Sequence, residues 1–413
     1  MFSIQEIRNQ FPAVSRKYKG KQVVYMDGPG GSQVVQSVID SMVAYMTNGG
    51  ANLHGEFPTS KETEEYIDAA RCAMADLVGA KPTEVAFGQN TTSLMFSVSR
   101  VLKNEWTGKD NIVVTEIDHR SNVDTWASAA QESNTEVRFI PVDTETLTLD
   151  LSHLPQLIDE NTKLVAVTLA SNAVGTIVDV EEISKRAHQV GALLAVDAVH
   201  AAPHFAIDRD KIGADLLFCS AYKFFGPHLG MAVIREEIFK TLSTYKLQPA
   251  PSYFPDKLET GTQSHEAIAS IEAAVNFIAS LGTGATRRER IENAFINLEE
   301  HENRLANKLR NGLASIPEVT LYQADNLTPK TPTIAFTIKG TDPVEVCRWI
   351  AENESIFIAS GDFYASTLAD KLGVNDNGGW IRAGLAPYNT EEEVDRLVNA
   401  VKTYVTQNVT LQR

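Results

Sequence analysis

The sequence contains few cysteines and no CxxC pair. Its 413 residues include only Cys72, Cys219 and Cys347. An odd and widely spaced set argues against a disulfide framework and against a structural zinc site, so we predict no metal ligand among them. We expect all three to be small, buried hydrophobic side chains.

Basic residues, long apolar runs and nucleotide-binding motifs are also scarce. The chain has 37 Lys and Arg against 53 Asp and Glu, a net charge of −16, which argues against nonspecific binding to nucleic acid or anionic lipid. No apolar run approaches the ~20 residues of a membrane span, and the N-terminus lacks a basic region followed by an apolar core. Neither GxGxxG nor a Walker sequence is present. We therefore predict a cytoplasmic protein without a nucleic-acid or membrane partner.

What the first two thirds of the chain does contain is a series of short apolar runs. Their Val, Leu and Ala content, without polar alternation, is typical of strands in a sheet covered on both faces. Helical segments such as Val180–Val190 separate them, which indicates an α/β domain with a mainly parallel, seven-stranded sheet. The seven predicted strands are Val23–Asp27, Glu84–Gly88, Ile112–Glu116, Val137–Pro141, Leu164–Leu169, Leu193–Asp197 and Leu216–Cys219.

The pattern changes beyond about residue 255, after the proline-rich piece Gln248–Ser252. Helices then dominate, and a smaller α+β domain is predicted. We therefore divide the chain into an N-terminal segment packing with the small domain (1–20), a large cofactor-binding domain (21–255) and a small C-terminal domain (256–413). The elements predicted in the last part are helices at Ser264–Leu281, Ala285–Leu313, Pro343–Asn353 and Thr390–Thr406, and strands at Val319–Tyr322, Thr333–Ile338 and Trp380–Leu385.

Polar groups follow three of the predicted strands, at the edge where open α/β sheets form their ligand crevice. Thr91 and Thr92 in Gly88–Ser93 could cradle a phosphate at a helix start, although both are also ordinary helix-capping residues. His119 follows another strand, where it either meets a ligand or is solvated. Asp197 could pair with a cationic ring nitrogen or simply cap a helix.

Two further side chains stand in unusual surroundings. Lys223 follows an apolar strand in a turn with aromatic and glycine neighbours, which favours a lowered pKa and Schiff-base chemistry over an ordinary surface position. Arg382 lies in a semi-apolar strand, where it could grip a carboxylate through two hydrogen bonds or could face water at a sheet edge.

Taken in order, these segments resemble the class V aminotransferases of pyridoxal phosphate fold type I, in particular the branch of cysteine desulfurases and selenocysteine lyases. The resemblance runs nearly end to end. It includes Phe11-Pro12, the segment Asn52-Leu53-His54-Gly55 and the stretch from Arg382 to Thr390. It implies pyridoxal 5'-phosphate as the cofactor.

The resemblance also implies a role for each matching residue. Lys223 would bind the cofactor covalently and act as the base, Asp197 would pair with the pyridine nitrogen, and His119 would stack on the ring. Arg382 would bind the carboxylate of a small amino acid. A homodimer with composite sites is implied, because Thr262 matches a residue that reaches the neighbouring subunit's phosphate. The remaining implied contacts are Thr91, Thr92 and Ser220 to the phosphate, Asn172 to the ring oxygen or substrate, and His54 to the substrate.

Three positions depart from the pattern of the desulfurases. His200 stands where a glutamine usually lies beside the cofactor phenolate, and Tyr222 replaces the histidine before the lysine. Tyr364 occupies the position of the persulfide-forming cysteine. With Asp362 it would line the substrate pocket or shuttle a proton, and the alternative is a loop tyrosine that faces solvent. The resemblance therefore favours β-elimination, as by a C–S or C–Se lyase, without persulfide chemistry. Transamination or epimerisation is the runner-up, and a noncatalytic cofactor-binding partner protein ranks lowest.

Overall fold

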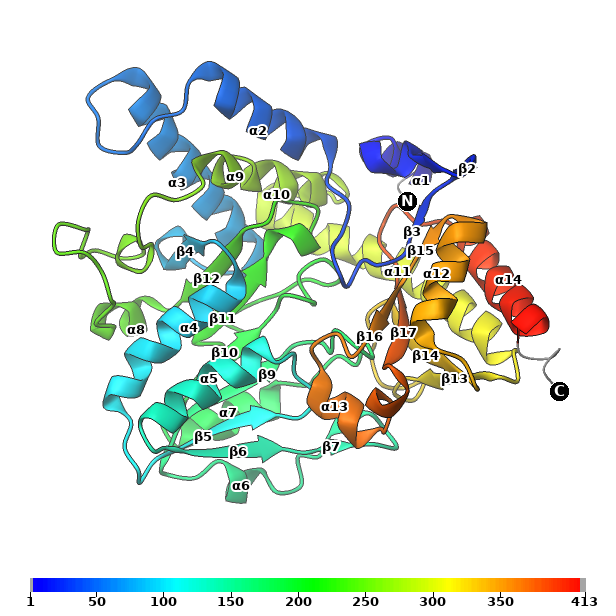
Figure 1. The fold of residues 1–413 in the computed structure, drawn as a ribbon. Helices are drawn as coiled ribbons and strands as arrows, with labels where there is room; N and C mark the ends of the chain where they lie inside the picture. Colours follow the sequence, from blue (N-terminus) through cyan, green and yellow to red (C-terminus); the bar gives the residue numbers. More distant parts are fainter. Residues whose placement is uncertain (1–2, 409–413) are drawn as a thin grey trace.

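A seven-stranded sheet forms the centre of the larger lobe in a computed structural model, which describes residues 3–408 (Figure 1). Only β12 runs against its neighbours, so the prediction of a mainly parallel sheet within an α/β fold is confirmed. In spatial order the strands are β4 (Val85–Gly88), β12 (Gly230–Ile234), β11 (Leu216–Ser220), β10 (Leu193–Asp197), β9 (Thr162–Thr168), β5 (Asn111–Thr115) and β6 (Glu136–Ile140).

Two strands differ from the prediction. The run Val23–Asp27 is not part of this sheet, because β3 (Val24–Tyr25) pairs in parallel with β15 (Ile356–Phe357) of the small domain. Its place is taken by β12, which sequence reasoning missed. The connection from Ser220 to Gly230 is too short for a parallel crossover, so β12 must return antiparallel to β11.

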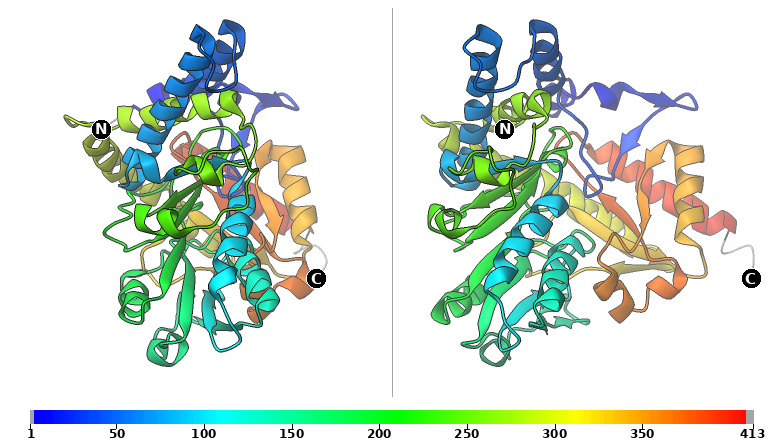
Figure 2. Two further views of the ribbon diagram at one scale, coloured as in Figure 1. Left: turned by 90° about the vertical axis from the view of Figure 1, so that its left-hand side faces the viewer. Right: turned by 60° about the vertical axis from the view of Figure 1, so that its left-hand side comes forward.

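Helices cover both faces of the large sheet, as its apolar strands require. Within β5, Val113 packs into one core with α3 (Pro58–Val78) and α7 (Glu181–Gln189). Its neighbour Val114 points into the opposite core, with α4 (Thr91–Leu102) and α5 (Ser121–Glu132). Figure 2 shows α3 rising above the sheet beside α2 (Gln36–Asn48). This two-sided burial leaves the strand ends as the place where polar groups can gather.

The small domain is a four-stranded antiparallel sheet covered by helices α12 (Pro343–Glu354) and α14 (Glu391–Asn408). Helix α14 begins as predicted, because Thr390 Oγ1 accepts the Glu393 N–H and Glu393 Oε2 accepts the Thr390 N–H, both at 3.3 Å. The strand order is β13 (Val319–Tyr322), β14 (Thr333–Ile338), β17 (Trp380–Gly384) and β16 (Ala359–Gly361).

The packing of the helices after residue 255 bears on where the border between the two domains lies. Helices α9 (His265–Ala269) and α10 (Ile271–Ser280) share the hydrophobic core of the large domain, so we propose a border after α10 in place of residue 255. Helix α11 (Arg287–Ala314) then enters both cores, with Phe295 in the large domain and Leu309 in the small one. One continuous amphipathic helix gives no sequence signal of where one core ends and the next begins.

The N-terminal segment packs against both domains rather than the small domain alone; its residues 1–2 lie outside the described part. Phe11 contacts three aromatic rings, those of Phe225, Phe277 and Tyr388, at centroid distances of 5.6, 5.2 and 4.9 Å. Arg8 Nη1 lies 2.8 Å from Oε1 of Glu393 in the small domain. The segment therefore joins α10, the turn after Lys223 and the start of α14.

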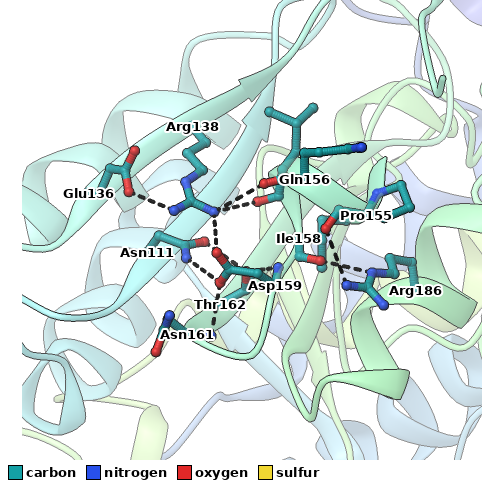
Figure 3. A network of polar contacts seen from close by, with 11 residues as sticks. Asn111, Glu136, Arg138, Pro155, Gln156, Ile158, Asp159, Asn161, Thr162 and Arg186 are labelled. Carbon is teal, nitrogen blue, oxygen red and sulfur yellow. Dashed lines mark hydrogen bonds and ion pairs between the residues drawn. The ribbon is translucent and has the colours of Figure 1, made fainter. Parts of the chain in front are cut away.

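A polar network lies at the β6 edge of the large sheet, where β5 and β6 begin (Figure 3). Arg138 Nη1 donates to Asp159 Oδ2 at 2.8 Å, and its Nη2 donates to Glu136 Oε2 at 2.8 Å. Asp159 in turn accepts from Asn111 Nδ2 and from the backbone of Asn161, both at 2.9 Å. Arg138 holds the pKa of Asp159 below its usual range. Charged side chains on an edge strand also discourage pairing with a second sheet.

The aromatic cluster at Phe11 generates a prediction about stability. Replacing Phe11 by alanine should lower the free energy of unfolding by about 3–5 kcal/mol, because a fully buried ring leaves a cavity between two domains. Chemical unfolding followed by tryptophan fluorescence measures the change. Phe57→Ala is the control, since this ring is 52% exposed. Equal losses in both variants would contradict a bridging role for the N-terminal segment.

Candidate active site

A cavity of about 540 Å³ lies where the carboxyl ends of the large-domain strands face β16 and β17. Asp197 is the last residue of strand β10, Lys223 lies in the turn after β11, and Arg382 lies in β17. Most of the residues singled out in the sequence meet here. The cavity is lined by Thr91, Thr92, His119, Asn172, Asp197, His200, Ser220, Tyr222, Lys223, Tyr364 and Arg382.

Two of the singled-out residues lie elsewhere. His54 and Thr262 line a second cavity, of about 610 Å³, together with the loop around Leu247. His54 Nδ1 lies 3.4 Å from Glu64 Oε1. Within one chain, therefore, neither side chain belongs to the Lys223 cavity.

Lys223 is a buried amine at the end of a rigid, apolar strand. All five residues of β11 are buried, and a short 3-10 turn, Ala221–Lys223, carries the lysine into the cavity. Its Nζ donates to the Pro29 carbonyl and lies 4.8 Å from the centre of the Tyr222 ring. Burial, helped by the positive charge of Arg382, lowers the pKa of Lys223 to about 7. The amine is thus available in its neutral, nucleophilic form near neutral pH.

Asp197 supplies a buried carboxylate from the next strand. Its Oδ1 accepts the Val199 N–H at 2.8 Å, and burial raises the pKa of Asp197 to about 6. A second carboxyl, Asp118, lies behind the cavity wall and accepts the Thr168 N–H at 3.1 Å. Burial, with a contribution from Asp197, raises the pKa of Asp118 to about 8. Asp197 is therefore the carboxyl that is ionised near neutral pH and able to meet a cation.

His119 is held in one orientation beside the cavity. Its Nδ1 accepts the backbone N–H of Ser121 at 3.1 Å and lies 2.8 Å from the Ser121 hydroxyl. The remaining proton of a neutral ring is then on Nε2. Burial and the charges of Lys223 and Arg382 lower the pKa of His119 to about 4. A neutral aromatic ring is what stacking on a heterocycle requires.

The start of α4 offers donors for an anion. Asn90, not a threonine, caps this helix, because its Oδ1 accepts the Ser93 N–H at 2.8 Å. Within residues 3–408 the backbone N–H groups of Thr91 and Thr92 have no hydrogen-bond acceptor. The Thr91 hydroxyl lies 2.6 Å from that of Ser220. Free amides and two hydroxyls at a helix start suit a phosphate group.

Arg382 is buried with part of its hydrogen-bonding capacity unused. Its Nη2 donates to Asp27 Oδ1 at 3.0 Å, its Nη1 donates to the Asn172 carbonyl at 2.9 Å, and its guanidinium carbon lies 3.7 Å from the centre of the Phe363 ring. Arg382 Nε and Asn172 Oδ1 are both buried without a partner in the described chain. These orphaned groups fit a ligand that carries both an acceptor and a donor.

Sequence reasoning missed Asp27 and Phe363 as parts of this site. Asp27 ends an apolar run and precedes Gly28-Pro29-Gly30-Gly31, so a polar group at a strand end was the available signal. Phe363 carried none, because its contact with Arg382 depends on a loop whose backbone φ of 54° is left-handed.

No cysteine among the described residues lines the cavity. Cys219 is buried within β11, as expected. Cys347 is only partly buried and Cys72 is exposed, so the expectation of three buried thiols was wrong. Burial raises the pKa of Cys347 to about 12, which keeps this thiol protonated.

Comparison with known proteins now decides the family. The model of the family described as aminotransferase class-V matches residues 24–397. The chain belongs to this family. It is 32% identical to the aminotransferase-like protein FGM3 of Gibberella zeae, over 97% of this chain and 98% of that protein. It is 29% identical to a cysteine desulfurase of Enterobacter sp., with the same coverage of both chains.

Solved structures show the same architecture. The apo cysteine desulfurase of Thermococcus onnurineus superimposes with a TM-score of 0.86 at 28% identity, covering 98% of this chain and 99% of that one. The Escherichia coli desulfurase CsdA gives a TM-score of 0.85 at 24% identity, again over 98% and 99% of the chains, which supports the fold. The fold type I arrangement is confirmed. Separately, no helix in the described chain has the length and apolar character to cross a membrane.

Members of this family use pyridoxal phosphate, and the protein is an enzyme of this cofactor class. The residues present fit the group: the neutral amine of Lys223, the carboxylate of Asp197, the ring of His119 and the free amides at Thr91 and Thr92 converge on one cavity. When bound, the cofactor supplies an electron sink for the α-carbon of an amino acid.

The lowered pKa generates a prediction about amine reactivity. In the cofactor-free protein, modification of Lys223 by a small amine-specific reagent should reach half its maximal rate near pH 7, because the amine is deprotonated above its pKa. Exposed Lys185, whose pKa is raised by Glu181, should react only at much higher pH. Peptide mapping by mass spectrometry measures both residues in one sample. If the modification rates of Lys223 and Lys185 had the same pH dependence, this would contradict a pKa of Lys223 lowered by burial.

Proposed function

We propose that this enzyme catalyses β-elimination from a small, cysteine-like amino acid, releasing a sulfur or selenium leaving group without forming a persulfide. The observation that carries the proposal is a cavity equipped for α-proton abstraction and lined, among residues 3–408, by no thiol. The family membership supplies the cofactor chemistry. It does not by itself select among the reactions that begin at the α-carbon.

In this proposal each buried charge has a separate task. Arg382 would bind the substrate carboxylate, and the unpartnered Nε offers one more donor for it. Lys223 would hold the cofactor, and its free amine would accept the α-proton of the substrate at Nζ. The electrons of the broken Cα–H bond would then expel the leaving group from Cβ. Asp197 would keep the pyridine nitrogen protonated by charge pairing.

Tyr364 supports elimination over persulfide chemistry. It stands at the mouth of the cavity, 69% exposed, with its ring 5.3 Å from that of His119. A phenol can exchange a proton but cannot store sulfane sulfur. Position 364 thus offers a group that could assist a leaving group, and no nucleophile for sulfur.

Transamination is the second candidate, and epimerisation is the third. Similarity to the aminotransferase-like protein FGM3 favours transamination, since the two chains align almost end to end. Both alternatives share the first proton abstraction with elimination. They differ in where the next proton returns, and a noncatalytic role would leave every amino acid unchanged.

A homodimer with composite sites is the second part of the proposal. Thr262 and His54 line a cavity of their own, next to Tyr245 and Leu247, which are 61% and 71% exposed. Exposed apolar side chains beside an incomplete polar site favour a subunit interface. A second copy would bring Thr262 to the partner's phosphate cradle. The cytoplasmic location stays a prediction from composition.

A product screen tests the reaction. Purified enzyme is incubated with a panel of amino acids, and pyruvate, sulfide or selenide, keto acids and chirality are assayed. Elimination predicts a keto acid and sulfide in equal amounts with no amino acceptor. Keto acid formed only when an amino acceptor is present would select transamination, and loss of optical activity alone would select epimerisation.

Replacement of the cysteines gives a sharper prediction. A Cys72→Ser, Cys219→Ala and Cys347→Ser triple variant should keep the wild-type rate of sulfide release, because no thiol takes part. Alkylation and mass spectrometry of the wild-type enzyme under turnover should find no persulfide. A cysteine-dependent persulfide that forms and decays at the rate of product release would refute elimination. Lys223→Ala is the negative control, since it should lose the borohydride-reducible cofactor linkage and all turnover.

Subunit mixing tests the composite site. Lys223→Ala and Thr262→Val chains should each be impaired alone. After subunit exchange in an equal mixture, one site of every mixed dimer regains both residues, which restores about one quarter of the wild-type sites. Activity and cofactor absorbance measure the recovery, and sedimentation confirms that the chains exchange. A monomer that holds the cofactor firmly would contradict the composite site.

A further inference from the structure

His200 lies in the turn after β10, and its imidazole forms part of the cavity wall. One ring nitrogen, Nε2, lies 3.0 Å from the hydroxyl of Thr331 and 3.0 Å from that of Thr333. The other, Nδ1, makes no hydrogen bond within residues 3–408. It is also not one of the solvent-inaccessible polar atoms that lack a hydrogen-bond partner in the described chain, so it retains accessible surface. Nδ1 is therefore the nitrogen that is open to the cavity.

The ring is neutral, so its single proton is on one nitrogen or the other. Burial lowers the pKa of His200 well below its ordinary value, and the neighbouring His204, Lys223 and Arg382 lower it further. His204 lies with its ring 5.3 Å from that of His200, and its own Nδ1 is 2.9 Å from Glu302 Oε2. Which nitrogen carries the proton is set by the hydroxyls at Nε2.

The hydroxyls of the two threonines differ in their hydrogen-bond partners. The Thr331 hydroxyl has a second acceptor, the Gly175 carbonyl at 3.4 Å, to which it can donate. The Thr333 hydroxyl has no partner in the described chain except His200 Nε2. A buried hydroxyl proton needs an acceptor, so Thr333 donates to the lone pair of Nε2. The imidazole proton is then on Nδ1, where it faces the cavity.

We propose that Thr333 fixes the tautomer of His200, so that Nδ1–H is a permanent hydrogen-bond donor to an anionic oxygen in the cavity, namely the phenolate oxygen of bound pyridoxal phosphate. The inference rests on the proposed cofactor site. A glutamine amide always has an NH₂ group that rotation of the side chain can present as a donor. A histidine at this position offers a donor only when a second residue selects the tautomer, which makes Thr333 a positioning residue.

The position of Thr333 follows from the fold. It is the first residue of β14, which is an inner strand of the small-domain sheet and pairs with β17, the strand that carries Arg382. Thr333 is buried, as is Thr331. The small domain thereby contributes both the carboxylate-binding arginine and the residue that orients a large-domain histidine.

Nitrogen NMR of the full-length protein, labelled with ¹⁵N only in histidine, tests the tautomer without cofactor. His200→Gln assigns the signal. The wild type should show a protonated Nδ1 and an unprotonated Nε2. Thr333→Val, which keeps the shape but removes the hydroxyl, should move the proton to Nε2, where the Thr331 oxygen accepts it. Thr333→Ser should restore the wild-type pattern, and Thr331→Val is the matched control that should leave the tautomer unchanged.

Cofactor binding gives the second readout. Absorbance titration with pyridoxal phosphate should show affinity weakened roughly tenfold or more in Thr333→Val, because a donor to a charged oxygen is lost, and nearly unchanged in Thr331→Val. An Nε2-protonated His200 in the wild type, or a tautomer indifferent to Thr333→Val, would overturn the inference. A tautomer change without any change in affinity would overturn the contact with the cofactor.

The two proposals fail separately. If the wild-type protein binds no pyridoxal phosphate, or if borohydride reduction attaches the cofactor to a lysine other than Lys223, the proposed function fails while the tautomer is still decided by NMR. If Thr333→Val does not fold, the wild-type and Thr333→Ser spectra still decide which nitrogen carries the proton.

Discussion

The burial of opposite charges around one cavity is the constraint on which the rest of the structure depends. Lys223 and Arg382 are removed from water together, and Asp27 and Asp197 only partly compensate them. Burial, reinforced by the neighbouring cations, lowers the pKa values of His119 and Lys223, so His119 stays neutral and the lysine amine is deprotonated near neutral pH. Such an arrangement is costly without a ligand. An anionic phosphate and a substrate carboxylate are the natural counter-ions for it.

The fold holds this arrangement by using the ends of rigid elements. Asp197 ends a strand buried on both faces, and Lys223 follows another. Arg382 comes from an interior strand of the other domain, and Asp27 reaches it from a segment that pairs with the small domain. Because α11 belongs to both cores, the two domains are joined by a continuous helix, and the hydrogen bond from Arg382 Nη1 to the Asn172 carbonyl adds a second link. The cavity is therefore assembled between two frameworks whose relative position is fixed at several points.

The sequence predicted best what depends on local pattern. Strand ends after buried apolar runs located Asp197 and Lys223, and a capping box located the start of α14. Prediction from the sequence failed where the pairing of a strand depends on the tertiary structure. The run ending at Asp27 has the pattern of a large-sheet strand but pairs with the small domain. Strand β12 was overlooked because its antiparallel return follows from the short connection after β11. Thr333 and Phe363 could not be assigned from sequence. Thr333 meets His200 only across the domain border, and Phe363 meets Arg382 only through the fold of the loop after β16.

The loop around Phe363 shows how the backbone itself restricts the chemistry. Phe363 and Tyr364 both adopt left-handed φ values, 54° and 58°, which ordinary side chains rarely take. Contacts on both sides offset this strain: Asn172 Nδ2 donates to the Phe363 carbonyl at 2.8 Å, and the Arg120 N–H donates to the Tyr364 carbonyl at 2.7 Å. The turn directs the Phe363 ring onto Arg382 and leaves the Tyr364 ring at the mouth. A side chain at position 364 therefore approaches the cavity from its mouth, so the chemistry available there depends on the residue type and not on the backbone alone.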